Sequence, residues 1–273
     1  MNIRTRLNYY RRSGVTVSLK YKDFKTSQVD TLYDDKIDQA QTVSFEEQYL
    51  AIRQKEKRIY SDQETARLPE ISPSHIYYKE WIARKDSSGR LISYLTNKNK
   101  PLNILEIGCG NGWLSSKLAG IQDARVTGLD INRIEIEQAK RVFKSDNLEF
   151  IYNKFSTGLF ESPRFDCIVF AASIQYFPSF RSIINDCLLL LDTTGEIHII
   201  DTHFYNQGSL GKASDRTKKY YSSIGFPAMS ANYHYHTFND LRSFKYKVLF
   251  NPRSIINKLF NTSNPFYWIT ISG

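Results

Sequence analysis

The stretch 102–114 reads LNILEIGCGNGWL, and it decides the fold class of this chain. Its first half is a short apolar run of the kind found in buried strands. Gly108, Gly110 and Gly112 follow in alternation, and such glycines let a chain turn tightly and bring backbone N–H groups against a ligand. Residues 113–121 then carry apolar side chains at helical spacing. The stretch therefore predicts a strand, a glycine-rich turn and a helix.

The same alternation of strand and helix continues to residue 201. We expect further strands at 124–130, 148–152 and 165–173, and one after Gly195. The signals for helix starts are Asn132 with Glu135, and Ser179. Strands that are apolar throughout and alternate with helices indicate a parallel sheet covered on both faces. This is the α/β, doubly wound class, in which ligands bind beyond the carboxyl ends of the strands.

Regions of weaker pattern flank this core. Upstream, we expect helices over 44–60, with a capping box at Ser44 and Glu47, and over 74–95. Downstream, we expect a helix over 210–224, an aromatic irregular stretch over 225–236, and strands at 245–250 and 266–271. We therefore divide the chain into an N-terminal extension, 1–97, helical from about residue 44 and forming a lid, and a domain, 98–273, with its motif core at 101–201.

Length and composition limit the classes of protein to which this chain can belong. A chain of 273 residues supports one sizeable core. No apolar run approaches the ~18 residues of a membrane-spanning helix, and the basic start lacks the apolar stretch of a secretory signal. Three cysteines, Cys109, Cys167 and Cys187, have no metal-ligand spacing. We expect a cytoplasmic protein; the acid-poor start leaves an organelle presequence as the alternative.

The net charge of +9 belongs to the two ends of the chain. Residues 1–25 carry +6 and residues 202–273 carry +7, whereas residues 101–201 carry −4. A basic excess on the flanks bears on the substrate or partner and modestly favours an anionic one.

The glycine motif discriminates between cofactors. A dinucleotide fingerprint, G-x-G-x-x-G, needs a third glycine where this chain has Trp113, which disfavours an NAD-dependent reductase. The chain instead reads E-x-G-x-G-x-G from Glu106 to Gly112. Asp130 ends the second strand, twenty-two residues after Gly108. A carboxylate in that place can accept hydrogen bonds from both hydroxyls of an adenosine ribose.

These features resemble the class I S-adenosylmethionine (SAM) methyltransferases, and most of all the broad bacterial group that includes the ubiquinone/menaquinone-biosynthesis type. The likeness covers 101–201 and is carried by the glycine motif, the strand-two acid and the opening Phe165-Asp166 of strand four. The resemblance implies a Rossmann-like sheet of about seven strands with the last antiparallel, SAM as cofactor and S-adenosylhomocysteine (SAH) as product.

The resemblance also implies roles for single residues. The glycine turn would cradle the methionine portion, oriented by Glu106; Asp130 would hold the ribose diol, and Ile131 would cover one face of the adenine. The cofactor-binding candidates are Glu106, Gly108, Cys109, Gly110, Gly112, Asp130, Ile131, Asn153, Lys154, Phe155 and Ala171.

One position departs from the family. After the third strand the family often has an acidic residue that accepts from the adenine amino group, and here that position is Lys154. Lysine cannot accept a hydrogen bond. The Asn153 side chain or the backbone would then read the adenine edge, with Phe155 stacked on the ring.

Acceptor residues are expected after strands four and five. His203 is a candidate base, Tyr176 a candidate catalytic or positioning group and Gln175 a positioning group, while His234 and His236 can reach in from the C-terminal segment. An ordinary loop or surface role stays open for each. We expect no metal, because these histidines lack a further ligand cluster. Lid candidates in the extension are Arg53, Arg58, Tyr60, His75 and Tyr78.

Motifs that are absent from the sequence narrow the range of expected methyl acceptors. The turn after strand four reads AASIQYF, without the Asn/Asp-Pro-Pro-aromatic tetrapeptide of amino-group methylation on adenine or glutamine, and no Pro-Cys or Thr-Cys pair occurs. We therefore expect methyl transfer to a small molecule, with anionic, glycan-linked and lipid-linked molecules all open. The alternatives are an RNA methyltransferase that uses the basic flanks, and a non-catalytic SAM-fold binding protein. The oligomeric state is not predicted.

Overall fold

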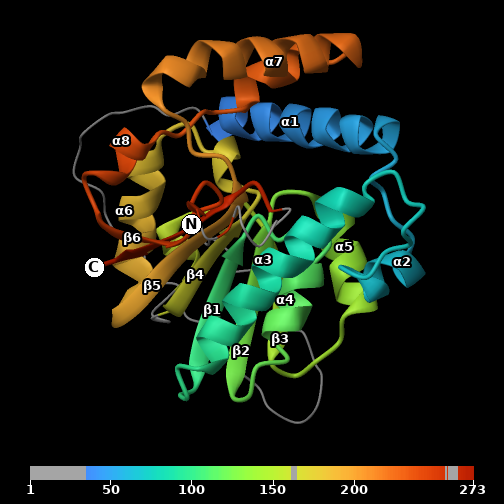
Figure 1. Cartoon of the computed structure of the whole chain (residues 1–273). Coiled ribbons are helices and arrows are strands. Elements are labelled where there is room, and N and C mark those ends of the chain that lie inside the picture. Colours follow the sequence, from blue (N-terminus) through green and yellow to red (C-terminus); the bar gives the residue numbers. More distant parts are fainter. Residues whose placement is uncertain (1–34, 161–164, 256, 258–263) are drawn as a thin grey trace, which may run out of the picture.

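The computed structural model describes residues 35–160, 165–255, 257 and 264–273 (Figure 1). The basic segment 1–25 lies outside the described residues, as does the rest of the chain before Asp35. None of the helices that the structure describes is both long and apolar enough to cross a membrane.

A seven-stranded sheet forms the centre of the fold, in the order β3-β2-β1-β4-β5-β7-β6. Strands β1 to β5 run parallel, and β7 runs antiparallel to both of its neighbours. The doubly wound sheet with an antiparallel last strand is therefore confirmed. The strands are β1 (Leu102–Ile107), β2 (Ala124–Asp130), β3 (Leu148–Tyr152), β4 (Phe165–Ala171), β5 (Leu191–Thr202), β6 (Lys245–Phe250) and β7 (Tyr267–Ser272).

Helices cover both faces of the sheet (Figure 1). Alternate residues of β1 face opposite ways: Ile104 packs against α3 and α4, and Leu105 packs against α6. Both are fully buried, which explains why the strand is apolar throughout. The helices on one face are α3 (Tyr78–Thr96), α4 (Trp113–Leu118) and α5 (Arg133–Val142), and those on the other are α6 (Phe180–Leu190) and α8 (Phe238–Leu241).

A helical layer lies across the carboxyl end of the sheet. It consists of α1 (Asp35–Lys55) and α7 (Leu210–Ser223), which lie side by side in Figure 1, and the short helix η4 (Pro227–Asn232), which contacts both. Ile52 of α1 packs against Tyr221 of α7 and Met229 of η4. The C-terminal segment thus joins the N-terminal extension above the strand ends.

The N-terminal extension is also attached to the rest of the domain through α2 (Asp62–Arg67) and α3. Ser61 and Glu64 form a reciprocal capping box at the start of α2. The buried Tyr60 hydroxyl accepts a hydrogen bond from Trp81 Nε1 at 2.8 Å, and Trp81 in turn meets Trp113 edge to face. This aromatic contact connects the extension to the helix that follows the glycine turn.

The starts of three elements differ from expectation by four residues or more. Helix α1 begins at Asp35, so Ser44 lies inside the helix and is not its cap. Helix α3 begins at Tyr78, because the hydrogen-bonded turn from Ser72 to His75 precedes it. Strand β5 begins at Leu191, directly after α6, and Gly195 lies within it, where a Cβ atom would meet the Phe165 carbonyl oxygen at 2.8 Å.

Candidate functional site

A cavity of about 340 Å³ opens at the carboxyl ends of β1 and β4. These strands are neighbours in the sheet, while the chain continues outward from β1 in one direction and from β4 in the other. Such a switch point leaves a crevice, because the turns after the two strands diverge. The lining residues include Gly108, Gly110, Asp130, Ile131, Asn153, Lys154, Phe155, Ala172, Ser173, Tyr176, Phe177 and, from the helical layer, Phe45, Glu46, Tyr49 and Asn232.

The glycine turn has a conformation that other residues rarely adopt. Gly108, Gly110 and Gly112 all have a positive φ, of 77°, 53° and 76°. A Cβ atom on Gly108 would lie 2.4 Å from Ser173 Cβ, and one on Gly112 would lie 2.5 Å from the ring of Phe150. Gly108 therefore lets the turn approach the chain after β4, and Gly112 packs against β3 beneath the turn instead of lining the cavity.

Glu106 lies beneath the turn and is 2% exposed. One of its carboxylate oxygens accepts a hydrogen bond from Ser115 Oγ at 2.5 Å. The pKa of Glu106 is raised to about 8, chiefly by burial and also by nearby Asp130, while the Ser115 hydroxyl opposes the shift. The ionised carboxylate is thus short of partners, and a donor or cation on its open side would stabilise it.

Asp130 is held by the backbone on both sides. Its carboxylate accepts hydrogen bonds from the N–H groups of Gly110 and Asn132, each at 2.8 Å. Burial and the neighbouring Glu135 nevertheless raise its pKa to about 7. Asp130 therefore joins the glycine turn to the end of β2 and faces the cavity with an incompletely compensated charge.

A second, polar cavity of about 70 Å³ adjoins the first and shares Tyr49, Gly108, Gly110 and Ala172 with it. Three arginines from the extension enter it, Arg53, Arg58 and Arg84. Arg58 forms a two-point hydrogen bond with Glu80. Arg53 contacts Glu135 at 3.4 Å through Nη2, but its buried Nε has no hydrogen-bond partner. A buried donor without a partner indicates room for an anionic group beside the glycine turn.

The other side of the main cavity is aromatic. The Tyr176 ring meets Phe45 and Tyr49 of α1 edge to face, with centroids 5.8 and 5.9 Å apart. Tyr233 approaches Tyr176 from the C-terminal segment at 6.3 Å. The helical layer thus supplies an apolar wall opposite the turn after β4.

All of the cofactor candidates except Gly112 line one or both of these cavities. Asp130, Ile131, Asn153, Lys154 and Phe155 line the main cavity. Glu106, Cys109 and Ala171 line the polar cavity instead. The roles assigned to these residues stay predictions.

The acceptor candidates are more dispersed. Tyr176 lines the main cavity. Gln175 is buried and bonded to the Ala172 carbonyl and to Thr202. His203 is exposed and lies against Phe266 with ring centroids 4.7 Å apart. His234 and His236 line a separate pocket of about 540 Å³ beside α6. Their proposed entry into the acceptor site stays a prediction.

Metal binding was not expected. Among the side chains that the structure describes, no three His, Cys, Asp or Glu residues gather closely enough to hold a metal ion.

The lid candidates divide in the same way. Arg53, Arg58 and Tyr60 line the polar cavity, whereas His75 and Tyr78 line neither cavity. Sequence reasoning missed Phe45, Glu46, Tyr49 and Asn232 on the cavity wall. The available signal was the helical spacing of Phe45, Tyr49 and Ile52, but only the tertiary fold shows that this face meets the cavity.

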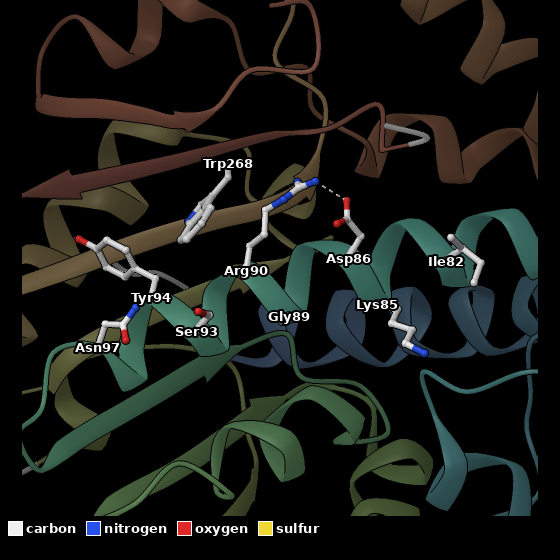
Figure 2. Close-up of a pocket in the computed structure, with 9 residues that line it drawn as sticks. All are labelled: Ile82, Lys85, Asp86, Gly89, Arg90, Ser93, Tyr94, Asn97 and Trp268. Atoms are coloured by element: carbon white, nitrogen blue, oxygen red, sulfur yellow. Dashed lines mark hydrogen bonds and ion pairs between the residues drawn. The ribbon is translucent and has the colours of Figure 1, made fainter. Parts of the chain in front are cut away.

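A larger open groove of about 760 Å³ lies on the outer side of α3 (Figure 2). Trp268 of β7 and Tyr94 form one end of it, and the ion pair between Arg90 and Asp86 lies along its floor. It shares no residue with the two cavities at the strand ends, so it does not belong to the candidate site.

The chain is similar to several known proteins. A family model described as a methyltransferase domain matches residues 98–247. Ubiquinone biosynthesis O-methyltransferase of Glaesserella parasuis is 30% identical over 118 residues, which are 40% of this chain and 50% of that protein. Malonyl-[acyl-carrier protein] O-methyltransferase of Acetivibrio thermocellus is 28% identical over 131 residues, 44% of this chain and 46% of that protein. The matches thus span about half the length of these curated relatives.

A solved structure shows the same fold. The magnesium protoporphyrin IX methyltransferase of Synechocystis, crystallised with SAH, superposes with a TM-score of 0.51 at 16% identity, over 81% of this chain and 94% of that one. The family model covers more than half of the chain and includes the glycine turn and Asp130. The chain therefore belongs to the class I SAM-dependent methyltransferase family, whose cofactor is SAM.

Proposed function

We propose that this chain transfers a methyl group from SAM to a small-molecule acceptor and releases SAH. The observation that carries the proposal is a pair of adjoining cavities beside the glycine turn. The polar cavity contains the Arg53 Nε that has no hydrogen-bond partner, and Asp130 lines the aromatic cavity. The first suits the charged amino acid end of SAM, and the second suits its nucleoside and an apolar acceptor.

The donor set fits the cofactor. Arg53 would pair with the carboxylate of the methionine portion, and its buried Nε would gain a partner. Glu106 and Asp130 have raised pKa values and would gain the ammonium and ribose hydroxyl donors that stabilise their charged forms. We assign Ile131 and Phe155 to the two faces of the adenine, because both line the far end of the cavity.

The protein has to orient the reactants and exclude water. Bound SAM would supply a methyl group on a positively charged sulfur: an acceptor lone pair would form a bond to the methyl carbon as the carbon–sulfur bond breaks, and SAH would leave with its sulfur neutral. The backbone of the glycine turn holds the cofactor in place. The rings of Phe45, Tyr49 and Tyr176 hold the acceptor in line with the methyl group, in a site shielded from water.

Tyr176 acts as a hydrogen-bond donor in this scheme. Burial raises its pKa, so the phenol keeps its proton at neutral pH and positions the acceptor instead of deprotonating it. Among the described residues that line the main cavity there is no histidine. An acceptor whose reacting atom carries no proton suits a cavity with this lining, since its reaction needs no general base.

Calorimetric titration with SAH tests the cofactor site. The wild type should bind SAH, and Asp130→Ala should weaken binding at least about tenfold, because it removes a charge-assisted hydrogen-bond acceptor. Asp146→Ala, which removes an exposed carboxylate outside both cavities, should leave binding unchanged. Absence of binding to the wild type would contradict the proposed function.

Transfer is tested separately by a screen of small apolar and aromatic acceptors with methyl-labelled SAM. Label recovered in a small-molecule product would support the proposal. Binding of SAH without transfer to any acceptor, RNA included, would favour a non-catalytic binding protein.

A further inference from the structure

An acidic side chain of α1 lies at the end of the main cavity away from Arg53. Glu46 of α1 lines this cavity together with Ile131, Asn153 and Phe155. One of its carboxylate oxygens accepts the backbone N–H of Arg133 at 2.7 Å, at the first turn of α5. The other accepts the Tyr152 hydroxyl at 3.1 Å, at the end of β3. Glu46 is therefore held over the ends of β2 and β3.

Its carboxylate has capacity for a further donor. Each carboxylate oxygen can accept two hydrogen bonds, whereas the two Glu46 oxygens accept one each from the groups above. The Tyr152 side chain is 45% exposed, so water can replace Glu46 as its partner. Glu46 and Asp130 are the two acidic residues on the described cavity wall, and Asp130 is already bonded to Gly110 and Asn132.

The spacing of side chains along α1 suits a ligand whose two ends differ in their hydrogen-bonding groups. Glu46, Tyr49 and Arg53 stand at positions i, i+3 and i+7, which share one helix face. The two charged residues are about 10 Å apart along the axis, because each residue adds about 1.5 Å. The helix thus presents an acceptor at the nucleoside end of the site and a donor at the amino acid end.

We propose that Glu46 accepts a hydrogen bond from the exocyclic amino group of the adenine, so that the lid helix reads the base. The inference rests on the proposed function, since it assigns a positioning residue to the same cofactor. Lys154, at the same end of the cavity, carries an ammonium that can only donate. The carboxylate of Glu46 supplies the complementary acceptor from another element.

The test compares two ligands that differ at this amino group. SAH carries it, and S-inosylhomocysteine has an oxygen in its place. The wild type should bind SAH at least about tenfold more tightly in calorimetric titrations, because a carboxylate accepts from the amino group and repels the oxygen. Glu46→Ala should lose this preference, with the affinity for SAH falling and that for S-inosylhomocysteine changing little.

Two further variants sharpen the result. Glu47→Ala removes the same charge from the exposed neighbouring position and should keep the wild-type preference. Glu46→Gln keeps the shape of the side chain and gains an amide N–H₂ that can donate to the inosine oxygen. It should shift the preference toward S-inosylhomocysteine, and it serves as the folded variant if Glu46→Ala loosens α1.

Equal loss of affinity for both ligands in Glu46→Ala, with an unchanged preference in Glu46→Gln, would overturn the inference. Glu46 would then only fasten α1 to α5. Failure of the wild type to bind either ligand would instead overturn the proposed function itself, so the two failures are distinguishable.

Discussion

At the scale of single residues, the candidate site contains buried charged groups that are only partly stabilised by hydrogen bonds and opposite charges. Glu106 and Asp130 have pKa values raised chiefly by burial, and Arg53 has a buried nitrogen without a hydrogen-bond partner. Folded proteins rarely leave buried polar groups in this state without a functional reason. The charges also have the signs that complement an ammonium, two hydroxyls and a carboxylate.

Arg53→Ala should weaken SAH binding by about tenfold or more, because it removes a charge-assisted hydrogen bond to the ligand carboxylate. Binding of 5′-methylthioadenosine, which lacks the amino acid end, should hardly change. Competition titrations with both ligands measure this difference. Arg67→Ala, at an exposed position of α2, is the matched control. Equal weakening of the two ligands would show that Arg53 only supports the lid.

Cofactor affinity should fall as the pH is lowered through about 7. Donors on the ligand favour the ionised carboxylates, whereas the free site holds protons on Asp130 below a pKa of about 7 and on Glu106 below about 8. Binding at pH 6 should therefore release protons, with affinity falling up to about tenfold per pH unit for each proton released.

Calorimetry at pH 6 in buffers of different ionisation enthalpy measures this release. Asp130→Asn should remove part of it. An affinity that is flat from pH 5.5 to 8.5 would contradict the proposed contacts.

At the scale of elements, the glycine turn is a junction between three strands. Gly108 lets the turn approach Ser173 after β4, while Gly112 packs against Phe150 of β3. The Ser173 hydroxyl also donates to the Ile107 carbonyl at 2.6 Å. Because the approach is this close, the turn conformation and the packing of β1, β3 and β4 depend on one another.

Gly108→Ala should lower the free energy of unfolding by about 2–5 kcal/mol, as the sum of left-handed backbone strain and a steric clash. Gly89→Ala, in the middle of α3 with nothing within 4 Å of its Cβ position, should instead raise it by about 0.5–1 kcal/mol. Urea denaturation of both variants measures the contrast. A Gly108→Ala variant as stable as the wild type would show that the turn can relax.

At the scale of the whole molecule, the two ends of the chain meet above the sheet. Helix α1 from the extension packs on α7 and η4 from the C-terminal segment, with Ile52, Tyr221 and Met229 at the contact. The same helix lines both the polar and the aromatic cavity. In the proposed function, α1 would therefore couple cofactor binding to the position of the aromatic rings of Phe45, Tyr49 and Tyr176.

SAH should slow amide hydrogen exchange in α1 at least about tenfold, because local opening of the helix would have to break the ligand contacts. Amides of α6, on the face of the sheet away from α3 and α4, should show a much smaller change. Exchange measured by mass spectrometry with and without SAH separates these segments. Equal slowing in α1 and α6 would indicate a general stabilisation without lid closure.

The sequence alone determined the core and the cofactor motif. The strand-and-helix alternation of 101–201, the positions of β2 and β3 and the turn after β1 follow from local patterns of apolar residues and glycines, which act over a few residues. Asp130 could be placed at the end of the second strand for the same reason, while its role toward the ribose stays a prediction.

Only the tertiary structure decided which distant residues complete the site. Glu46 and Arg53 lie some eighty residues before the α5 residues they contact, and no local pattern encodes that packing. His203 is as close to a strand end as Asp130 is, yet it lies exposed against Phe266, because the C-terminal segment determines where that loop goes. Motifs within one strand and turn are readable from sequence, whereas a wall assembled from both ends of the chain depends on long-range packing.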